Sequence, residues 1–232
     1  IKNVNEIADH GLEVFYESVD EGKHEYEIGV SVEKAVVETA LEEGKNERAQ
    51  AYAMIQSGPE QTAIAGYPYS FSSKRKLRSG DLVLIELDVC VEGYWADLTR
   101  TVVVGRASKQ QKEIYNTVLE AQTAAFKALR EGEIASDVDA SARTVIERAG
   151  YGRYFHHGLG HGIGVCLHEP LFPPPYSQIH PLSHSRFQIG NILTMEPGIY
   201  FEDFGGIRIE DDILCRRDRG EYLSNSRREI EP

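Results

Sequence analysis

The order of the predicted secondary-structure elements constrains the fold of this chain more than any other feature of the sequence. Two segments with apolar residues at helical spacing are followed by runs of β-branched and aromatic residues that are bounded by glycine. The predicted helices are residues 3–19 and 27–43, and the predicted strands are 51–57, 82–91 and 94–104. The same succession of two helices and strands then begins again, which predicts an α+β fold built from two similar halves.

Capping signals mark the helices of the second half. Ser108 is followed three residues later by Gln111, which is the spacing of a capping box at the start of a long amphipathic helix. Ser136 and Asp139 are predicted to cap a further helix, which Gly150 ends. Strand and turn segments continue from there to about Leu223.

Two short segments support the duplication at the level of residues. Residues 80–86 and residues 190–196 both begin with a glycine turn, continue through four mostly apolar strand positions and end on a glutamate. A glycine turn before a strand is common, so neither segment alone is informative. Their shared position after a pair of helices favours two copies of one arrangement.

Composition narrows the classes of function. The 232 residues include 25 basic and 37 acidic side chains, a formal net charge of −12, which argues against binding to nucleic acid. No apolar run approaches membrane-spanning length, which argues against a membrane partner. The three cysteines follow no C-x-x-C spacing and predict neither a disulfide framework nor a structural zinc site. We therefore expect a soluble cytoplasmic protein.

Acidic residues stand inside apolar strands, where they are unexpected. They are Glu86, Asp88, Asp97, Glu196 and Glu210. A buried carboxylate persists only if it is protonated, ion-paired or bound to a metal. For any one of these residues the alternative is that strand alternation directs the side chain to solvent.

A glycine-rich segment adds imidazoles to this acidic set. His157 and His161 lie four residues apart in residues 156–164, and the glycines between them exclude a stable helix. His168 follows seven residues later. Glycine allows the backbone to approach another group closely, and imidazole is a common ligand of divalent transition ions. The alternative is a flexible glycine loop with incidental histidines.

These segments together resemble the pita-bread-fold metallopeptidases, the family of methionine aminopeptidase, aminopeptidase P and prolidase. The resemblance covers about residues 7–230 and is nearest to the catalytic domain of the Xaa-Pro peptidases. These enzymes usually carry an additional N-terminal domain, which we expect to be absent from this chain. The matching pieces are Tyr94-x-x-Asp97-x-Thr99-Arg100-Thr101, His157-Gly-Leu-Gly-His161-Gly-Ile-Gly, His168-Glu169-Pro170, Met195-Glu196-Pro197-Gly198-Ile199-Tyr200 and Gly206-Ile207-Arg208-Ile209-Glu210-Asp211. We expect residues 1–232 to form a single catalytic domain.

The resemblance implies a centre of two divalent metal ions. Asp97 and Glu210 would bridge both ions, His161 and Glu196 would complete one of them, and Glu86 would help to hold the other. An oxygen-rich site with one imidazole suits manganese, cobalt, iron or zinc.

The resemblance also implies the reaction, which is hydrolysis of a short peptide with proline after its first residue. A metal-bridging hydroxide would attack the carbonyl, and Glu196 would carry its proton to the departing nitrogen. His157 and His168 would bind the substrate or the developing oxyanion. Arg208 would hold a site carboxylate in place, although its spacing alone is equally compatible with a surface ion pair. A homodimer is the expected assembly.

Three departures from the family pattern bear on the metal site. The family has aspartate where this chain has Glu86, and usually has glycine where it has Asp88. Alternation puts both side chains on one strand face, so Asp88 either joins Glu86 at the metal or adds charge beside it. The family also has an upstream histidine, and here Tyr67 and Tyr69 occupy that stretch. A degraded site with one weak metal position is the alternative.

Two other classes of function stay open at this point. One is an enzyme that acts on another small-molecule substrate, because one fold hosts several chemistries. The other is a binding module that has lost catalysis. Retention of the whole acidic and histidine set speaks against the second, because binding alone does not require metal ligands.

Overall fold

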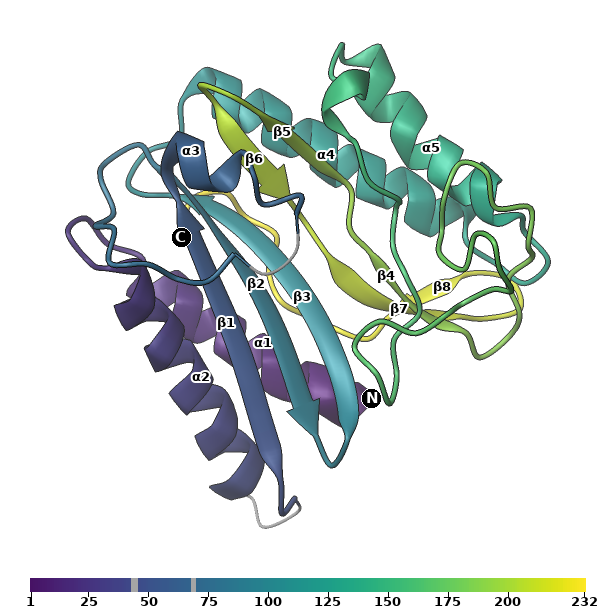
Figure 1. Cartoon of the computed structure of the whole chain (residues 1–232), viewed down its shortest axis with the longest axis horizontal. Coiled ribbons are helices and arrows are strands. Elements are labelled where there is room, and N and C mark those ends of the chain that lie inside the picture. Colours follow the sequence, from purple (N-terminus) through teal and green to yellow (C-terminus); the bar gives the residue numbers. More distant parts are fainter. Residues whose placement is uncertain (43–45, 68–69) are drawn as a thin grey trace.

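The computed structural model describes residues 1–42, 46–67 and 70–232. Within these ranges the two-helix-and-strands order occurs twice, as predicted, and the fold class is α+β. Figure 1 shows the two halves side by side, with α1 and α2 against the strands of the first half and α4 and α5 against those of the second. None of the helices in these ranges combines the length and the apolar composition that crossing a membrane requires.

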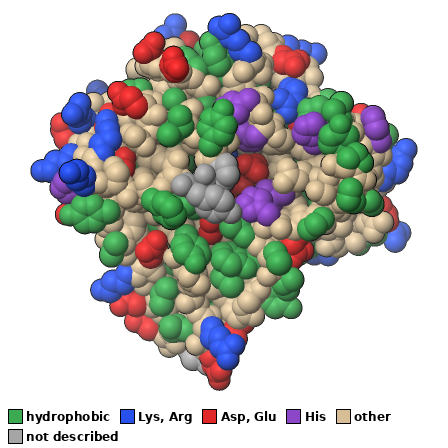
Figure 2. Space-filling model, in the orientation of Figure 1, with side chains coloured by type: hydrophobic (Ala, Val, Ile, Leu, Met, Phe, Trp, Pro, Cys, Tyr) green, Lys and Arg blue, Asp and Glu red, His purple; other side chains and the backbone are tan. Residues whose placement is uncertain are grey.

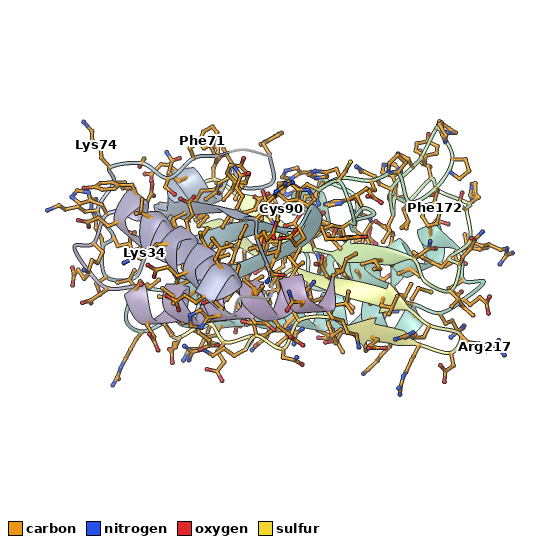
Figure 3. All side chains as sticks on the ribbon, turned by 90° about the horizontal axis from the view of Figure 1, so that it is seen from below. Lys34, Phe71, Lys74, Cys90, Phe172 and Arg217 are labelled. Carbon is orange, nitrogen blue, oxygen red and sulfur yellow. The ribbon has the colours of Figure 1, made fainter. Side chains whose placement is uncertain are left out.

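The first half is a three-stranded antiparallel sheet covered on one face by two helices. Its elements are α1 (Lys2–Ser18), α2 (Glu25–Glu42), β1 (Ala49–Ser57), α3 (Gly58–Thr62), β2 (Leu82–Val91) and β3 (Tyr94–Val103). Strand alternation decides which side chains meet the helices: Val83, Ile85 and Leu87 pack with α1 and α2 in one hydrophobic core. Figure 3 shows these helices below the sheet, with Phe71 on the opposite side.

The second half repeats this plan with shorter strands. Its elements are α4 (Lys109–Ala128), α5 (Ala135–Arg148), a short 3₁₀ helix η1 (Gly152–Tyr154), β4 (Ile192–Met195), β5 (Gly198–Phe201), β6 (Gly205–Arg208), β7 (Asp211–Cys215) and β8 (Gly220–Tyr222). The predicted capping box is confirmed, because the Ser108 hydroxyl accepts from the Gln111 N–H at 3.2 Å and the Gln111 side chain accepts from the Ser108 N–H at 2.8 Å.

The predicted cap of α5 is wrong. The helix begins at Ala135, and no side chain caps it, so Ser136 and Asp139 lie inside the helix. The N–H groups of Ala135 and Ser136 donate instead to the carbonyls of Ser185 and Ser183, which removes the need for a capping side chain.

The two halves meet along β3. The strands form three sheets of order β1-β2-β3, β4-β7-β8 and β5-β6. The Glu210 N–H donates to the Thr99 carbonyl at 3.1 Å, and the Arg208 N–H donates to the Thr101 hydroxyl at 3.1 Å. β3 of the first half is therefore hydrogen-bonded to the 208–210 segment of the second, which brings acidic residues from both halves to one seam.

The predicted duplication is visible in the backbone. Gly80 and Gly190 both adopt a left-handed conformation, with φ of 85° and 89°, immediately before strands β2 and β4. Glu86 lies within β2, and Glu196 follows the last residue of β4.

Candidate metal centre

The first sheet carries its acidic residues on the face opposite to α1 and α2. Glu86 pairs in register with Thr99, and Asp88 pairs with Asp97 on the neighbouring strand. Asp88 and Asp97 are buried, with exposed fractions of 2% and 3%. The alternative that these two strand carboxylates point to solvent is therefore wrong.

The glycine-rich segment lies against β4 of the second half. A Cβ at Gly160 would come within 2.1 Å of the Thr194 carbonyl oxygen, so only glycine fits there. The Thr194 hydroxyl accepts from the His161 N–H at 3.1 Å, and the Leu159 carbonyl accepts from the Glu196 N–H at 2.9 Å. This contact sets His161 and Glu196 side by side.

Asp97, His161 and Glu210 converge at the seam. Each offers one ligand atom, and these atoms lie within 4.8 Å of one another. His161 Nε2 is 3.6 Å from Asp97 Oδ2 and 3.7 Å from Glu196 Oε1. Glu210 accepts a hydrogen bond from the Thr99 hydroxyl at 2.6 Å. Residues separated by more than 100 positions in the sequence thus form one buried cluster.

Glu86 lies at the same cavity but is paired with Arg208. Arg208 Nη2 donates to Glu86 Oε2 at 2.7 Å, its Nη1 donates to the Tyr200 hydroxyl at 3.1 Å, and its Nε donates to the Thr99 hydroxyl at 3.0 Å. Arg208 is 4% exposed, which excludes the surface ion pair that its spacing allowed.

Asp88 lies beside Asp97 but does not line the cavity. Burial, together with the nearby charges of Asp97 and Glu86, raises the pKa of Asp88 to about 10. One of its oxygens has no hydrogen-bond partner among the described residues. Asp88 is therefore a buried neighbour of Asp97 on the adjacent strand, outside the cavity lining.

The cavity has a volume of about 200 Å³ and contains the other predicted site residues. On the face seen in Figure 2, histidine and acidic side chains meet at a hollow near the centre. The His168 ring lies 3.9 Å from that of His161, centroid to centroid, and His157 Nε2 is 3.1 Å from the Tyr200 hydroxyl. The lining residues are Ala65, Gly66, Glu86, Asp97, His157, Gly158, Gly160, His161, His168, Gln178, Glu196, Arg208 and Glu210.

Sequence reasoning missed Tyr200 and Gln178. Tyr200 lies in one of the segments that match the family, but the sequence predicted no role for it. Its hydroxyl contacts both His157 and Arg208. Gln178 reaches the cavity from a proline-rich stretch without helices or strands, where no periodicity could have signalled it.

The electrostatics of the cluster favour a bound cation. Burial raises the pKa of Glu86, raises that of Glu196 to about 7 and raises that of Glu210 well above its ordinary value. Burial alone would lower the pKa of His161, but Asp97 and Glu196 outweigh it and raise that pKa to about 9. Crowded carboxylates with one unpartnered buried oxygen on Asp97 fit a divalent cation, which would neutralise them.

Comparison with known proteins agrees with this geometry. The profile of metallopeptidase family M24 matches residues 1–217. The chain belongs to metallopeptidase family M24.

Two archaeal relatives match almost the whole chain. The Xaa-Pro dipeptidase of Pyrococcus horikoshii is 35% identical over 99% of this chain and 61% of its own length. The Xaa-Pro dipeptidase of Pyrococcus furiosus is 35% identical over 99% of this chain and 62% of its own length. The chain therefore spans about three-fifths of the length of these relatives.

Solved structures confirm the pita-bread fold. The prolidase of Pyrococcus furiosus superposes with a TM-score of 0.87 at 36% identity, over 98% of this chain and 63% of that one. A variant of Escherichia coli aminopeptidase P superposes with a TM-score of 0.82 at 23% identity, over 99% of this chain and 56% of that one, and so supports the fold alone.

Of the two tyrosines in the stretch of the expected upstream histidine, Tyr69 lies outside the described residues. Tyr67 is 63% exposed and packs on His156, with 5.5 Å between ring centroids. The Cβ of a side chain at the adjacent Gly66 would come within 2.6 Å of His156 Nε2. Tyr67 and His156 thus lie next to Gly66 of the cavity wall.

Proposed function

We propose that this protein is a metal-dependent peptidase that cleaves short peptides with proline after the first residue. The observation that supports this most directly is the convergence of Asp97, His161 and Glu210 on one cavity. The names of the archaeal relatives supply the Xaa-Pro substrate class. An Xaa-Pro bond has no amide hydrogen and a fixed φ, which favours a dedicated compact pocket.

We assign two divalent ions to the centre, with manganese, cobalt, iron and zinc as the candidates. The residues that would hold these ions are Asp97, His161, Glu196, Glu210 and Glu86. Bound ions of this kind supply polarisation of the scissile carbonyl and activation of water. The raised pKa values of Glu196 and Glu210 support this assignment. Burial destabilises the ionised carboxylates, and a bound divalent cation would offset that loss of hydration.

Glu196 is the proton carrier in this proposal. It lines the cavity, with its Oε1 3.7 Å from His161 Nε2, so its carboxylate faces the space where water and substrate would bind. It would accept the proton released from water and donate it to the departing nitrogen.

His157 and His168 bind substrate from the side of the glycine-rich segment. Burial, with the nearby Arg208 charge, lowers the pKa of His157 to about 3, so its imidazole is neutral at physiological pH. A neutral ring beside the Tyr200 hydroxyl offers a hydrogen bond to a carbonyl or an oxyanion without adding charge. The pKa of His168 is also lowered by burial.

Arg208 orients Glu86, and Asp88 supports Asp97. The hydrogen bond of 2.7 Å from Arg208 Nη2 to Glu86 Oε2 fixes the orientation of the glutamate side chain at the cavity. Asp88 lies next to Asp97 outside the cavity lining, which favours a supporting role beside the metal ligands over direct metal binding.

Residues 1–232 act as one catalytic domain in this proposal, in a cytoplasmic homodimer. Three free cysteines without a disulfide among the described residues support a reducing compartment. The family resemblance supports the homodimer.

The decisive experiment starts from chelator-treated protein. Metal content after addition of Mn²⁺ or Co²⁺ is measured together with hydrolysis of Xaa-Pro dipeptides and of matched Xaa-Ala dipeptides. Two ions per chain and preferential Xaa-Pro turnover would support the proposal. Two ions without peptide turnover would move the assignment to another small-molecule hydrolase, and a chain that binds no ion would contradict it.

A further inference from the structure

The largest fully buried side chain of the described residues is not apolar. It is Arg100, with an exposed fraction of 0%, on β3 three residues after Asp97. Its register partner is Ile85, so it lies on the face of the sheet away from the cavity. None of the roles proposed above uses it.

All five N–H donors of the Arg100 guanidinium have acceptors. Four of the acceptors are backbone carbonyls, at 3.0 Å for Arg227, 2.9 Å for Thr99, 2.6 Å for Glu210 and 3.4 Å for Ser226. The fifth is Asp211 Oδ1, at 2.7 Å. Complete pairing makes burial of this charge tolerable and fixes the side chain in one position.

Asp211 is paired as completely as Arg100. Oδ1 also accepts from the Ser224 hydroxyl at 2.6 Å, and Oδ2 accepts from Gln122 Nε2 and Arg228 Nε at 2.8 Å each. Arg100 and Asp211 therefore form a buried ion pair in which both side chains are fully hydrogen-bonded.

This ion pair is bonded to the backbone that carries the cavity carboxylates. Arg100 bonds the carbonyl of Glu210 itself, and also the Thr99 carbonyl that receives the Glu210 N–H. Gln122, bonded to Asp211, donates to the carbonyls of Met195 at 3.1 Å and Ile209 at 3.3 Å, the residues before Glu196 and Glu210. Small displacements of these backbone segments would move three carboxylates relative to one another.

We propose that Arg100 and Asp211 are positioning residues that set the spacing of Asp97, Glu196 and Glu210 and thereby the affinity for the metal ions. The inference rests on the proposed function in one respect, that these carboxylates bind the ions. Outer partners of metal ligands commonly change metal affinity by about 10–100-fold when they are replaced.

The test is metal binding to chelator-treated protein, measured by calorimetric titration with Mn²⁺ and by the visible absorption spectrum of the Co²⁺ form. The variants are Arg100→Lys and Asp211→Asn, and the control is Arg75→Lys. Arg75 also pairs with an aspartate, Asp81, at 2.6 Å, but it does not contact a cavity carboxylate. Thermal unfolding with chelator present separates affinity from stability.

We expect Arg100→Lys and Asp211→Asn to lower Mn²⁺ affinity by about 10–100-fold and to alter the Co²⁺ spectrum, while Arg75→Lys leaves both unchanged. Arg228→Met, which removes one donor to Asp211 at a partly exposed position, is the milder variant if the others do not fold. We expect it to lower the affinity in the same direction by a few-fold.

The proposal would be overturned if Arg100→Lys and Asp211→Asn fold and keep the wild-type Mn²⁺ affinity and Co²⁺ spectrum, even with reduced thermal stability. If Arg228→Met is the only variant that folds, an unchanged Mn²⁺ affinity in that variant would overturn it. Failure of the wild-type protein to bind ions would instead contradict the proposed function.

Discussion

The two halves of the molecule share a plan but differ in what they give to the cavity. The ionisable side chains that the first half contributes are two carboxylates from regular strands, Glu86 and Asp97, with Asp88 next to Asp97 outside the lining. The second half contributes all three cavity histidines from irregular segments, together with Glu196, Arg208 and Glu210. Duplication therefore supplies the framework, and divergence of the connections supplies the imidazoles.

This division predicts that neither half has a functional centre alone. Asp97→Ala, in the first half, and His161→Ala, in the second, should each reduce metal-dependent turnover at least about 1,000-fold, because each removes a proposed metal ligand. Steady-state hydrolysis of an Xaa-Pro dipeptide, with circular dichroism for the fold, measures this. His10→Ala, an exposed histidine, is the control. Turnover retained in either cavity variant would refute the metal mechanism.

The two glutamates at corresponding places of the repeat should respond differently. Glu196→Gln should lower kcat by about 100- to 10,000-fold, because an amide cannot carry a proton. Glu86→Gln should chiefly weaken metal binding, by about 10–100-fold, because Glu86 is held by Arg208 and carries no proton in the mechanism. Rates at saturating Mn²⁺ and titration with Mn²⁺ separate the two effects. An equal loss of kcat in both variants would mean that Glu86 and Glu196 both take part in proton transfer.

The stability of chelator-treated protein should fall as the pH rises from 5 to 9. The pKa of Glu196 is raised to about 7 and that of His161 to about 9, so the folded chain binds more protons than the unfolded chain between the ordinary and the raised values. The stabilisation is complete below the ordinary values and is lost through this window.

Thermal unfolding at a series of pH values measures the loss, and each kcal/mol lost lowers Tm by about 2–4 °C for a chain of this size. Mn²⁺ should restore stability most at the alkaline end, because the deprotonated ligands bind it. A Tm that rises with pH in the presence of chelator would contradict the electrostatic description of the cavity.

The smallest effect concerns two helices of the second half. Ser108→Ala should destabilise the protein by about 1 kcal/mol, because the hydroxyl caps α4. Ser136→Ala should change stability by less than about 0.5 kcal/mol, because carbonyls of residues 183 and 185 already satisfy the start of α5. Urea unfolding of both variants checks the difference, and equal losses would show that Ser136 has a capping role after all.

Local signals account for most of what the sequence predicted correctly. Periodicity located the long helices α1, α2, α4 and α5 and the strands β1 to β3, but not the short helix α3. The spacing of Ser108 and Gln111 predicted a cap that the structure contains. The cap predicted for α5 was wrong because the groups that satisfy this helix come from a segment almost 50 residues away. Sequence spacing carries no information about such a partner.

The site was predicted as a set of residues rather than as a geometry. Alternation puts Glu86 and Asp88 on one face, yet only the folded structure shows that Glu86 lines the cavity while Asp88, the cross-strand neighbour of Asp97, does not. Arg100 also lies in a segment that matches the family, but the sequence predicted no role for it. Its hydrogen-bond partners Glu210 and Asp211 lie more than 100 residues away in the chain. Pairing between the halves is a property of the folded chain.

The contact between Gly160 and the Thr194 carbonyl has a consequence for mutational tolerance. A Cβ at position 160 would lie 2.1 Å from the Thr194 carbonyl oxygen, so the two main-chain segments can pack this closely only if residue 160 is glycine. This backbone packing, and not the rotamer preferences of His161, determines where the imidazole lies. In a library that randomises residues 158–164, selection for a folded, metal-binding chain should retain glycine at 160 as stringently as histidine at 161. The substitution Gly160→Ala adds only one methyl group, but it would displace the His161 imidazole without replacing any of the cavity's ionisable side chains.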